Sequence, residues 1–317
     1  MNQKLLSICI PTRGRIEILK NTLNSIFYSK VNFSDYEVVI YDSSDDDELS
    51  VLLASEYNYP NLIYKKGENR GFLNLVSALE LGNGFFLKLH NDYTTFIEGG
   101  LKDVLKLIKE HQQLKPLIFF SNGSLQIKTI GEYNNFNEFM YSLSYYSSWS
   151  TGFSIWKIDF QKQSNLEYSK MFPHTSLLFE QNDNDLFIVD NRIYFSNQDI
   201  PKKGGYNLFK TFCYDYLKMV EDCFKIGKIN HKTFSHIKMH MYLTFLIPWY
   251  YNTKVKNNNF TFDLAGIRQS MSRYYSFEFY FFMVFVSWFI YPIKNTFLRF
   301  LKLYELLKNK ILDKTSL

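Results

Sequence analysis

The stretch GFFLKLHNDY, residues 84–93, joins a short apolar run to three polar residues. The apolar run 85–89 has the length of a buried strand, and His90, Asn91 and Asp92 follow it directly. In an open α/β sheet, ligands bind at the carboxyl ends of inner strands, so a carboxylate here is a candidate ligand-binding group. Taken alone, the Asn-Asp pair is more typical of a turn, because both side chains hydrogen-bond their own backbone. The preceding sequence decides between these two interpretations.

Three further apolar runs, at 5–10, 37–41 and 62–64, precede this one. The segments between them have apolar residues three or four positions apart, which is the spacing of an amphipathic helix. Strands that alternate with helices in this way predict βαβ units. The predicted fold class is therefore α/β and Rossmann-like, with a mainly parallel sheet and helices on both faces.

Each of the four predicted strands runs into polar residues at its carboxyl end. Because parallel strands bring these ends to one edge of the sheet, we expect the polar residues to lie close together. One polar strand end is ordinary loop chemistry, whereas four that converge favour a binding site. The residues concerned are Thr12, Arg13, Arg15, Asp42, Ser43, Asn69 and Asp92.

The pattern continues after residue 100 with a predicted helix at 101–108 and a strand at 117–120. His174 stands just before an apolar run, which places it at the start of a helix. The short apolar segments 188–189 and 193–195 predict a hairpin that closes this part of the chain.

A change of character near residue 205 predicts a domain boundary. We expect residues 1–205 to form the main domain and residues 206–317 to form a helical C-terminal region. Helical spacing in the second part covers 209–226 and 234–247, and Pro248 is expected to end the second helix.

The 317 residues, 46% hydrophobic and 21% charged, are enough for one large α/β domain and a smaller part. The three cysteines lack metal-binding spacing and fit a reducing cytosolic setting, and no secretory signal is visible. From residue 294 onward there are six Lys or Arg and two acidic residues, so +4 of the net charge of +5 lies there. This asymmetry argues for an anionic partner of the C-terminal segment and against general nucleic-acid binding.

Four stretches together resemble the nucleotide-binding half of a family 2 glycosyltransferase with the GT-A fold. They are SICIPTRGR at 7–15, VVIYDSS at 38–44, ENRGFLN at 68–74 and FFLKLHNDY at 85–93. The pattern is most similar to bacterial O-antigen and capsule transferases of the abequosyltransferase-like type. The resemblance implies a nucleotide-sugar half at 1–100 and an acceptor half at 101–205.

The resemblance implies a nucleotide-sugar donor that binds at this edge of the sheet. The implied donor-binding residues are Pro11, Thr12, Arg13, Arg15, Asp42, Ser43, Asn69, Gly71, Asn74 and Lys203. A carboxylate such as Asp42 can accept two hydrogen bonds and so orient a base or ribose. Helix capping by Asp42 or Asn69 and a plain surface charge at Arg13 are the structural alternatives. Lys203 is either part of a lid over the diphosphate or part of a solvated loop.

Residues 90–92 align with the DXD motif of the family, whose carboxylates hold Mg²⁺ or Mn²⁺ against the diphosphate. Here the motif is His90-Asn91-Asp92, with one carboxylate. The resemblance implies a divalent metal held by Asp92, with His90 nearby. The departure from the pattern leaves metal dependence open.

An inverting transfer needs a general base for the acceptor hydroxyl, and the family places it downstream on a helix that faces the donor. His174 fits this position, and its ordinary pKa of about 6.5 suits the role. Asp183 and Asp185 are alternative bases, and a hydrogen-bonded structural histidine is the alternative for His174.

Residues 279–293 carry no charge but fall short of the ~20 residues that span a bilayer, so a buried or interfacial segment is expected. The final segment has an apolar stripe flanked by Lys and Arg, which is typical of a helix that lies on anionic lipid. The alternative is a helix that packs on the main domain or on a second subunit of a homo-oligomer.

These features predict an inverting glycosyltransferase in the cytoplasm, peripheral on the inner face of the cell membrane. It would move one sugar from a nucleotide donor to a surface glycan, with a lipid-linked oligosaccharide as the expected acceptor. One alternative is a non-catalytic nucleotide-sugar-binding scaffold subunit. A sugar nucleotidyltransferase is less favoured, because no Gly-rich, Lys-containing loop follows the first strand.

Overall fold

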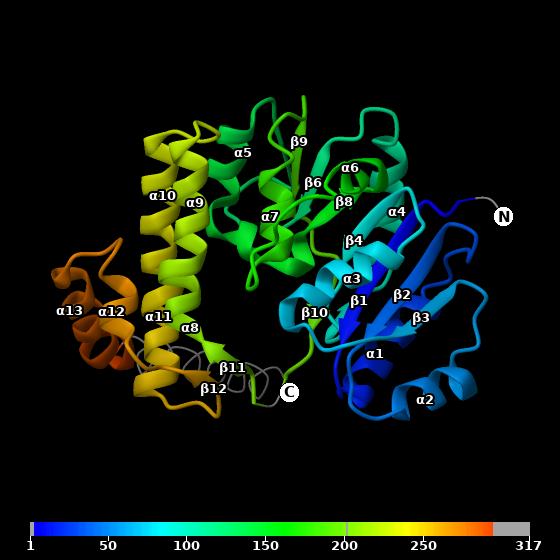
Figure 1. Cartoon of the computed structure of the whole chain (residues 1–317), viewed down its shortest axis with the longest axis horizontal. Helices are drawn as coiled ribbons and strands as arrows, with labels where there is room; N and C mark the ends of the chain where they lie inside the picture. Colours follow the sequence, from blue (N-terminus) through cyan, green and yellow to red (C-terminus); the bar gives the residue numbers. More distant parts are fainter. Residues whose placement is uncertain (1–2, 201, 294–317) are drawn as a thin grey trace, which may run out of the picture. The chain divides into compact units, whose positions relative to one another are not determined.

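The computed structural model describes residues 3–200 and 202–293. The described part of the chain forms two compact units (Figure 1). The first comprises the described residues of Met1–Ile200 and Lys218–Ile237, and the second those of Pro201–Leu217 and Lys238–Leu317. The domain boundary predicted near residue 205 stays a prediction.

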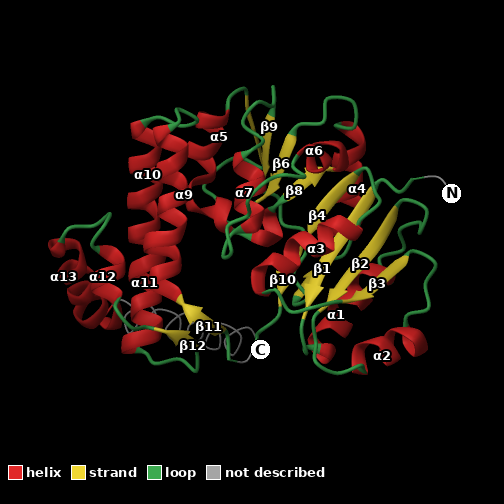
Figure 2. Ribbon diagram, viewed as in Figure 1, coloured by secondary structure: helices red, strands yellow, loops and turns green. Residues whose placement is uncertain are grey.

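A five-stranded sheet forms the centre of the first unit, with the strand order β3-β2-β1-β4-β8 (yellow in Figure 2). Its strands are β1 Leu6–Thr12, β2 Tyr36–Asp42, β3 Leu62–Lys66, β4 Phe86–Leu89 and β8 Ser154–Trp156. The first four strands are parallel, and β8 runs antiparallel to β4 at one side of the sheet. The predicted α/β fold with a mainly parallel sheet is confirmed.

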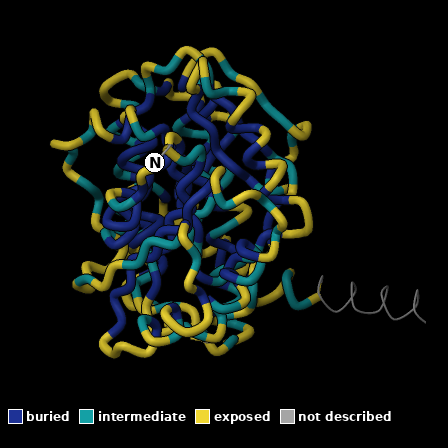
Figure 3. Tube along the Cα trace, turned by 90° about the vertical axis from the view of Figure 1, so that its right-hand side faces the viewer, coloured by how far each residue is buried: buried dark blue, intermediate teal, exposed yellow. Residues whose placement is uncertain are grey.

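Helices cover both faces of this sheet. They are α1 Ile16–Phe27, α2 Glu48–Glu56, α3 Asn74–Leu81 and α4 Gly100–Glu110. Ile8 and Ile10 of β1 share a core with α1, α2 and α4, whereas α3 packs against β1, β2 and β4 on the other face. A strand covered on both faces needs apolar residues at nearly every position, which explains the continuous apolar runs. Figure 3 shows buried chain (dark blue) inside and many exposed loops (yellow) around it.

A second sheet has three strands in the order β6-β9-β7, namely β6 Leu117–Phe120, β9 Phe187–Asp190 and β7 Ile130–Tyr133. The predicted hairpin of 188–189 with 193–195 is wrong. Strand β9 pairs with β6 and β7, while β10, Phe195–Asn197, pairs with β5, Thr94–Phe96. The reason is that β9 is the middle strand of this sheet, so both of its edges are already paired and none is left for residues 193–195.

Shorter helices follow in the chain: α5 Phe136–Leu143, α6 Lys157–Lys162 and α7 Pro173–Phe179. Pro173 occupies the first turn of α7, where its missing N–H and its fixed φ angle are both tolerated. His174 therefore lies at the start of a helix, as the sequence predicted. Two short 3₁₀ segments, Ser144–Ser148 and Ser150–Gly152, lead into β8.

The helices that begin at Leu208 contain π-helical turns. Their bounds are α8 Leu208–Lys210, π Thr211–Tyr216, α9 Leu217–Lys225, α10 His231–Met241, π Tyr242–Leu246, α11 Ile247–Tyr250 and π Tyr251–Val255. The prediction that Pro248 ends the second helix is wrong, since the helical path continues beyond it. A proline removes one N–H donor and clashes with the preceding turn. The wider π turns on both sides accommodate this defect.

The described chain ends with β11 Gly204–Asn207 paired to β12 Thr261–Asp263, and with α12 Ile267–Met271, α13 Phe277–Phe285 and the π segment Val286–Ile290. Within residues 3–200 and 202–293, no helix is both long enough and apolar enough to cross a lipid bilayer. The basic helix predicted after residue 293 lies outside the described residues.

Candidate functional site

The carboxyl ends of β1, β2 and β4 meet at one edge of the main sheet, which we call the carboxyl edge. Thr12 at the end of β1 is in register with Asp42 of β2, and Cys9 is in register with Leu89, directly before His90. Thr12, Asp42 and Asp92 are all buried. Buried polar groups require hydrogen-bond partners, and these partners define the candidate site.

One chain of hydrogen bonds joins five of the predicted site residues. Asn74 Nδ2 donates to Ser43 Oγ at 3.0 Å, and Ser43 Oγ donates to the Thr12 carbonyl at 3.2 Å. Thr12 Oγ1 donates to Asp92 Oδ2 at 2.8 Å, and Arg15 Nε donates to the same oxygen at 3.0 Å. The fold thus brings together side chains from β1, the loops after β1, β2 and β4, and the start of α3.

The Asp92–Arg15 ion pair is the charged centre of this network. The Asp92 side chain is 1% exposed and the Arg15 side chain 38% exposed. Burial raises the pKa of the Asp92 carboxyl, and the nearby Arg15 guanidinium opposes that rise. Thr22 Oγ1 of α1 donates to the Asp92 carbonyl at 2.9 Å, and the guanidinium lies 5.6 Å from the Tyr93 ring centre. Arg15 is therefore the solvent-accessible cation of a fixed pair.

Asp42 fixes the loop that carries Arg15. Its Oδ1 accepts hydrogen bonds from Ser44 N at 2.8 Å and Ser44 Oγ at 2.5 Å, and its Oδ2 accepts one from the Tyr64 hydroxyl at 3.0 Å. Ser44 Oγ in turn accepts a hydrogen bond from Gly14 N at 2.8 Å. Asp42 is not the residue that begins helix α2, since Asp47 holds that position.

His90 points into an aromatic environment. Its ring stacks on Phe96 with centres 4.9 Å apart and meets the edge of Phe195 at 5.5 Å. Nε2 lies 2.7 Å from the Thr94 carbonyl, so Nε2 carries the hydrogen that it donates. Nδ1 is buried without a hydrogen-bond partner among the described residues. Burial lowers the pKa of His90 to about 3, so the ring is a neutral packing group.

These contacts bear on the divalent metal that the sequence predicted at Asp92 and His90. The described residues contain no group of three or more His, Cys, Asp or Glu that could hold a metal ion. Mg²⁺ and Mn²⁺ favour oxygen ligands, and Asp92 Oδ2 is already shared by Thr12 and Arg15. His90 has committed Nε2 to a carbonyl. The donor set of the described residues does not fit such an ion.

The segment before β8 also reaches the carboxyl edge. Ser150 Oγ donates to Asn91 Oδ1 at 3.2 Å, and the buried Lys88 Nζ donates to the Thr151 carbonyl at 2.7 Å. The same segment carries Trp149, which is 37% exposed and meets the Tyr146 ring edge-on with centres 4.5 Å apart. An aromatic surface therefore lies close in the chain to the Asn91 contact.

His174 hydrogen-bonds the backbone of this segment. Its Nε2 donates to the Ser148 carbonyl at 2.9 Å, and Thr175 Oγ1 donates to the Ser147 carbonyl at 2.9 Å. Burial lowers the pKa of His174 to about 4, and Nδ1 is buried without a partner among the described residues. His174 is neutral at neutral pH, but its free lone pair does not reach the surface.

Asp183 and Asp185 are exposed and precede β9. Leu117 of β6 is in register with Phe187 of β9, so these two strands begin side by side. Trp156 of β8 pairs with Phe86 of β4, and its Nε1–H donates to the Pro116 carbonyl at 2.8 Å. The amino ends of β9, β6 and β4 therefore share one edge. Both aspartates therefore lie toward the edge opposite Asp92. The general-base role predicted for His174, Asp183 and Asp185 stays a prediction.

The other predicted donor residues lie apart from the hydrogen-bond chain. Pro11 is partly buried in β1, and Arg13 pairs with the exposed Asp45 at 3.1 Å. Asn69 Oδ1 accepts a hydrogen bond from Gly71 N at 3.1 Å, and Gly71 has a φ of 62°, which a glycine adopts without strain. Lys203 belongs to the second unit, where its ammonium lies 5.7 Å from the Trp249 ring centre.

Sequence reasoning missed four residues that hold the site: Ser44, Tyr64, Tyr93 and Gln198. Ser44 stood beside the predicted Asp42 and Ser43, and a run of short polar residues after a strand was the signal for it. Tyr64 lies on β3, where its hydroxyl reaches Asp42 from the neighbouring strand. Gln198 donates its N–H to the Tyr93 carbonyl at 2.9 Å across more than a hundred residues, and no local pattern reveals such a contact.

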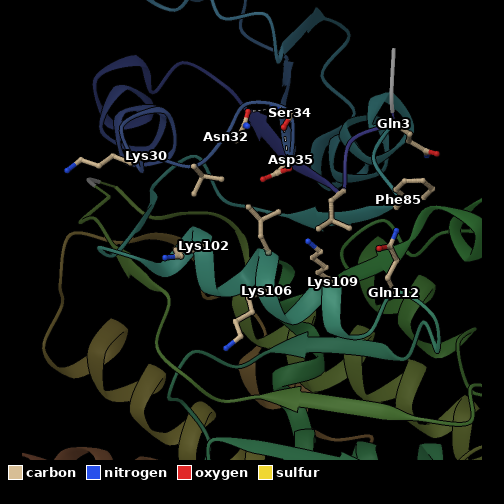
Figure 4. A pocket seen from close by; sticks show the side chains of 13 residues that line it. Gln3, Lys30, Asn32, Ser34, Asp35, Phe85, Lys102, Lys106, Lys109 and Gln112 are labelled. Atoms are coloured by element: carbon tan, nitrogen blue, oxygen red, sulfur yellow. Dashed lines mark hydrogen bonds between the residues drawn. The ribbon is translucent and has the colours of Figure 1, made fainter.

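The opposite, amino edge of the sheet has a pocket of about 610 Å³ lined by lysines (Figure 4). Lys102, Lys106 and Lys109 come from helix α4, and Lys30 lies across the pocket from this helix. Lys106 is 3.9 Å from Glu110, whereas Lys30, Lys102 and Lys109 make no ion pair with the described residues. Asp35 is the acidic residue among those that line the pocket. We call this feature the lysine pocket.

No family model and no curated protein sequence matches the chain. Solved structures do match. Residues 1–349 of S. aureus TarS in complex with UDP-GlcNAc give a TM-score of 0.58 at 17% identity over 80% of this chain and 77% of that chain. Full S. aureus TarS gives 0.55 at 17% identity, and the match covers 80% of this chain but only 46% of TarS.

A mannosyltransferase, PcManGT from Pyrobaculum calidifontis, was solved with GDP-Man and Mn²⁺. It gives a TM-score of 0.52 at 13% identity over 93% of this chain and 84% of that chain. At such low identities, the similarity shows a shared fold. The chain has the α/β fold of these nucleotide-sugar complexes.

Proposed function

We propose that this protein is a glycosyltransferase that uses a nucleoside-diphosphate sugar as donor. The observation that carries the proposal is the buried Thr12–Asp92–Arg15 cluster at the carboxyl edge, where α/β folds bind their ligands. The fold is that of structures solved with UDP-GlcNAc and GDP-Man. A cation that projects from a rigid carboxylate suits a diphosphate.

The reaction is a sugar transfer with inversion. The bond between the anomeric carbon and the diphosphate oxygen breaks, and a bond from that carbon to the acceptor oxygen forms. The nucleoside diphosphate leaves with the bonding electrons, and the acceptor hydroxyl loses its proton to a base. Arg15 stabilises the leaving diphosphate, and the Asp42–Ser44–Gly14 bonds hold the loop that carries it.

For the acceptor, we propose a glycan or a lipid-linked oligosaccharide. The partly exposed Trp149 and Tyr146 beside the Asn91–Ser150 contact offer an aromatic surface against which the apolar face of a sugar ring packs. His174 acts here as a positioning residue, because it holds the backbone of this segment.

The membrane surface is a further proposed partner. In α13 and the following π segment, Phe281, Phe285, Trp288 and Phe289 are each more than half exposed. Aromatic residues of this kind suit the interface between lipid and water. In a flotation assay the protein should rise with anionic vesicles, and Trp288→Ser should reduce the fraction that does so. A stable dimer in light scattering, with no vesicle binding, would assign this face to a second copy.

The function is tested by incubating the protein with UDP-, GDP-, CDP- and dTDP-sugars and measuring release of the nucleoside diphosphate. We expect slow release of nucleoside diphosphate from the donor alone, faster release when a glycan acceptor is added, and no release by Asp92→Ala. Donor binding without turnover for any acceptor would support the scaffold alternative, which the single carboxylate of residues 90–92 favours. A thermal-shift panel in which no nucleotide sugar stabilises the protein would overturn the donor site.

A further inference from the structure

The Asp92 carboxylate and the Arg15 guanidinium already form a complete charged pair. Two donors share Asp92 Oδ2, the Thr12 hydroxyl at 2.8 Å and the Arg15 Nε–H at 3.0 Å. The carboxylate is 1% exposed, so a divalent ion would have to displace buried partners to reach this oxygen. Breaking such a buried pair leaves an uncompensated charge, which is strongly unfavourable. The role of the Asp92 carboxylate is therefore to hold the Arg15 guanidinium in place.

The guanidinium keeps most of its donors available. Arginine has five N–H donors, and the bond to Asp92 uses the one on Nε. The terminal nitrogens of Arg15 make no hydrogen bond with the described residues, and the side chain is 38% exposed. The Tyr93 ring, 5.6 Å away, restricts the plane of the guanidinium. A fixed fork of this type matches two phosphate oxygens at once.

We propose that Arg15, held by Asp92 and Thr12, takes the place of a divalent cation and binds the donor diphosphate directly. The inference rests on the proposed function and specifies its chemistry. It assigns Arg15 as the phosphate-binding residue and Asp92 as the residue that positions it. A guanidinium stays charged at all physiological pH values, so it neutralises the leaving diphosphate without a bound ion.

The comparison with PcManGT sharpens this difference, because that protein was solved in complex with GDP-Man and Mn²⁺. In the present chain, Asp92 is the one carboxylate of residues 90–92, and His90 is turned into the aromatic core with Nε2 on the Thr94 carbonyl. The present chain thus offers an organic cation at the carboxyl edge, whereas the PcManGT structure that shares its fold contains a metal ion.

The test is isothermal titration of UDP and GDP into the full chain, once with excess EDTA and once with Mn²⁺. We expect the better of the two nucleotides to bind with dissociation constants that agree within about twofold in the two conditions. Arg15→Ala should weaken binding by about 30-fold or more in both, as expected for loss of the charge-assisted hydrogen bonds to the diphosphate. Lys20→Ala removes a cation of helix α1 that pairs with Glu56 of helix α2, and it should leave binding unchanged.

Two more variants separate positioning from metal binding. Asp92→Asn keeps an acceptor for Arg15 and Thr12, so binding should weaken by about tenfold or less and stay insensitive to EDTA. Arg15→Lys keeps the charge without the fork and should retain part of the affinity. Circular dichroism of each variant checks that it folds. If Arg15→Ala does not fold, the affinity of Arg15→Lys decides the test.

Binding that requires Mn²⁺, with Arg15→Ala unaffected or tighter, would overturn the inference and leave the proposed function intact. The inference would also be overturned if Asp92→Asn bound no nucleotide at any concentration while binding to the wild type required Mn²⁺. Failure of every nucleotide and nucleotide sugar to bind, with and without metal, would overturn the proposed function and this inference together.

Discussion

The two edges of the main sheet carry charge in opposite ways. At the carboxyl edge, Asp92 and Asp42 are buried, and each carboxylate is held by two or more side chains or backbone groups. At the amino edge, the lysines of the lysine pocket are exposed, and among the described residues only Lys106 has an ion-pair partner (Figure 4). Water screens the second set strongly and the first set weakly. The comparison teaches that charge number alone does not mark a reactive site, whereas burial and fixed partners do.

The largest effect is expected from Asp92→Ala at the carboxyl edge. The change leaves Arg15 and Thr12 without their shared acceptor, so the guanidinium loses the fixed orientation that the proposed diphosphate contact requires. We expect kcat/KM for donor turnover to fall about 100-fold, in line with 2–3 kcal/mol for a disrupted buried charge pair. Release of nucleoside diphosphate measures it. Glu56→Ala, which breaks an exposed pair with Lys20, is the control and should change turnover less than twofold.

A second test uses pH and the buried His174. Because burial lowers its folded-state pKa to about 4, the unfolded state binds the proton more readily between pH 4 and 6.5. The contribution of neutral His174 to stability is therefore present above pH 6.5 and is lost as the pH falls toward 4. Between pH 7 and pH 5 we expect a loss of about 2 kcal/mol in the free energy of unfolding from this group.

Urea unfolding at the two pH values measures this loss. His174→Gln keeps a donor for the Ser148 carbonyl but cannot titrate, so the wild type minus variant difference isolates the histidine. His90 also resists protonation, and it contributes equally to both proteins. An identical pH dependence in wild type and variant would show that the segment before β8 is not held in this way.

A smaller effect is expected from Tyr64→Phe. The change removes the hydroxyl that donates to Asp42 Oδ2 at 3.0 Å and leaves one oxygen of a buried carboxylate without that partner. Stability should fall by about 1–2 kcal/mol, and nucleotide affinity should weaken several-fold because the Ser44–Gly14 loop loosens. Thermal unfolding and titration of UDP or GDP check both numbers. Tyr28→Phe, at a tyrosine that is 67% exposed, is the control.

The smallest effect belongs to the amino edge. Lys102→Glu places an acidic residue in the first turn of α4, four positions before Lys106. It replaces a lysine–lysine spacing of four positions by a glutamate–lysine spacing and favours the helix dipole, so we expect stability to rise by about 0.5 kcal/mol, less at high salt. Donor turnover should not change. A marked loss of activity would break the contrast between the edges and assign a role in catalysis to the lysine pocket.

Local sequence was enough to predict the strands that lead into the site. The runs that became β1, β2 and β4 are apolar because both faces of the sheet are covered, and the polar residues after them lie at the carboxyl edge as expected. The helix start at His174 followed from its neighbours in the chain in the same way.

The failures came from contacts that local sequence does not specify. The hairpin was wrong because β6 and β7 already pair with both edges of β9, and the helix end at Pro248 was wrong because π turns accommodate the proline. The pairing of Asp92 with Arg15 joins residues 77 positions apart. A motif reading assigned Asp92 to a metal, and only the fold shows which cation stands beside it.

The strand β10 and Gln198 have a consequence for the order of events during synthesis. Strand β10 pairs with β5, and Gln198 donates to the Tyr93 carbonyl and to the Ile18 carbonyl, so the loop after Asp92 is anchored by residues made roughly a hundred positions later. At 5–20 residues per second, a ribosome needs about 5–20 s to produce them. For that interval the nascent chain has its central strands but not the anchors of its charged pair. In a chain truncated before residue 195, we therefore expect the loop after Asp92 to lack these anchors.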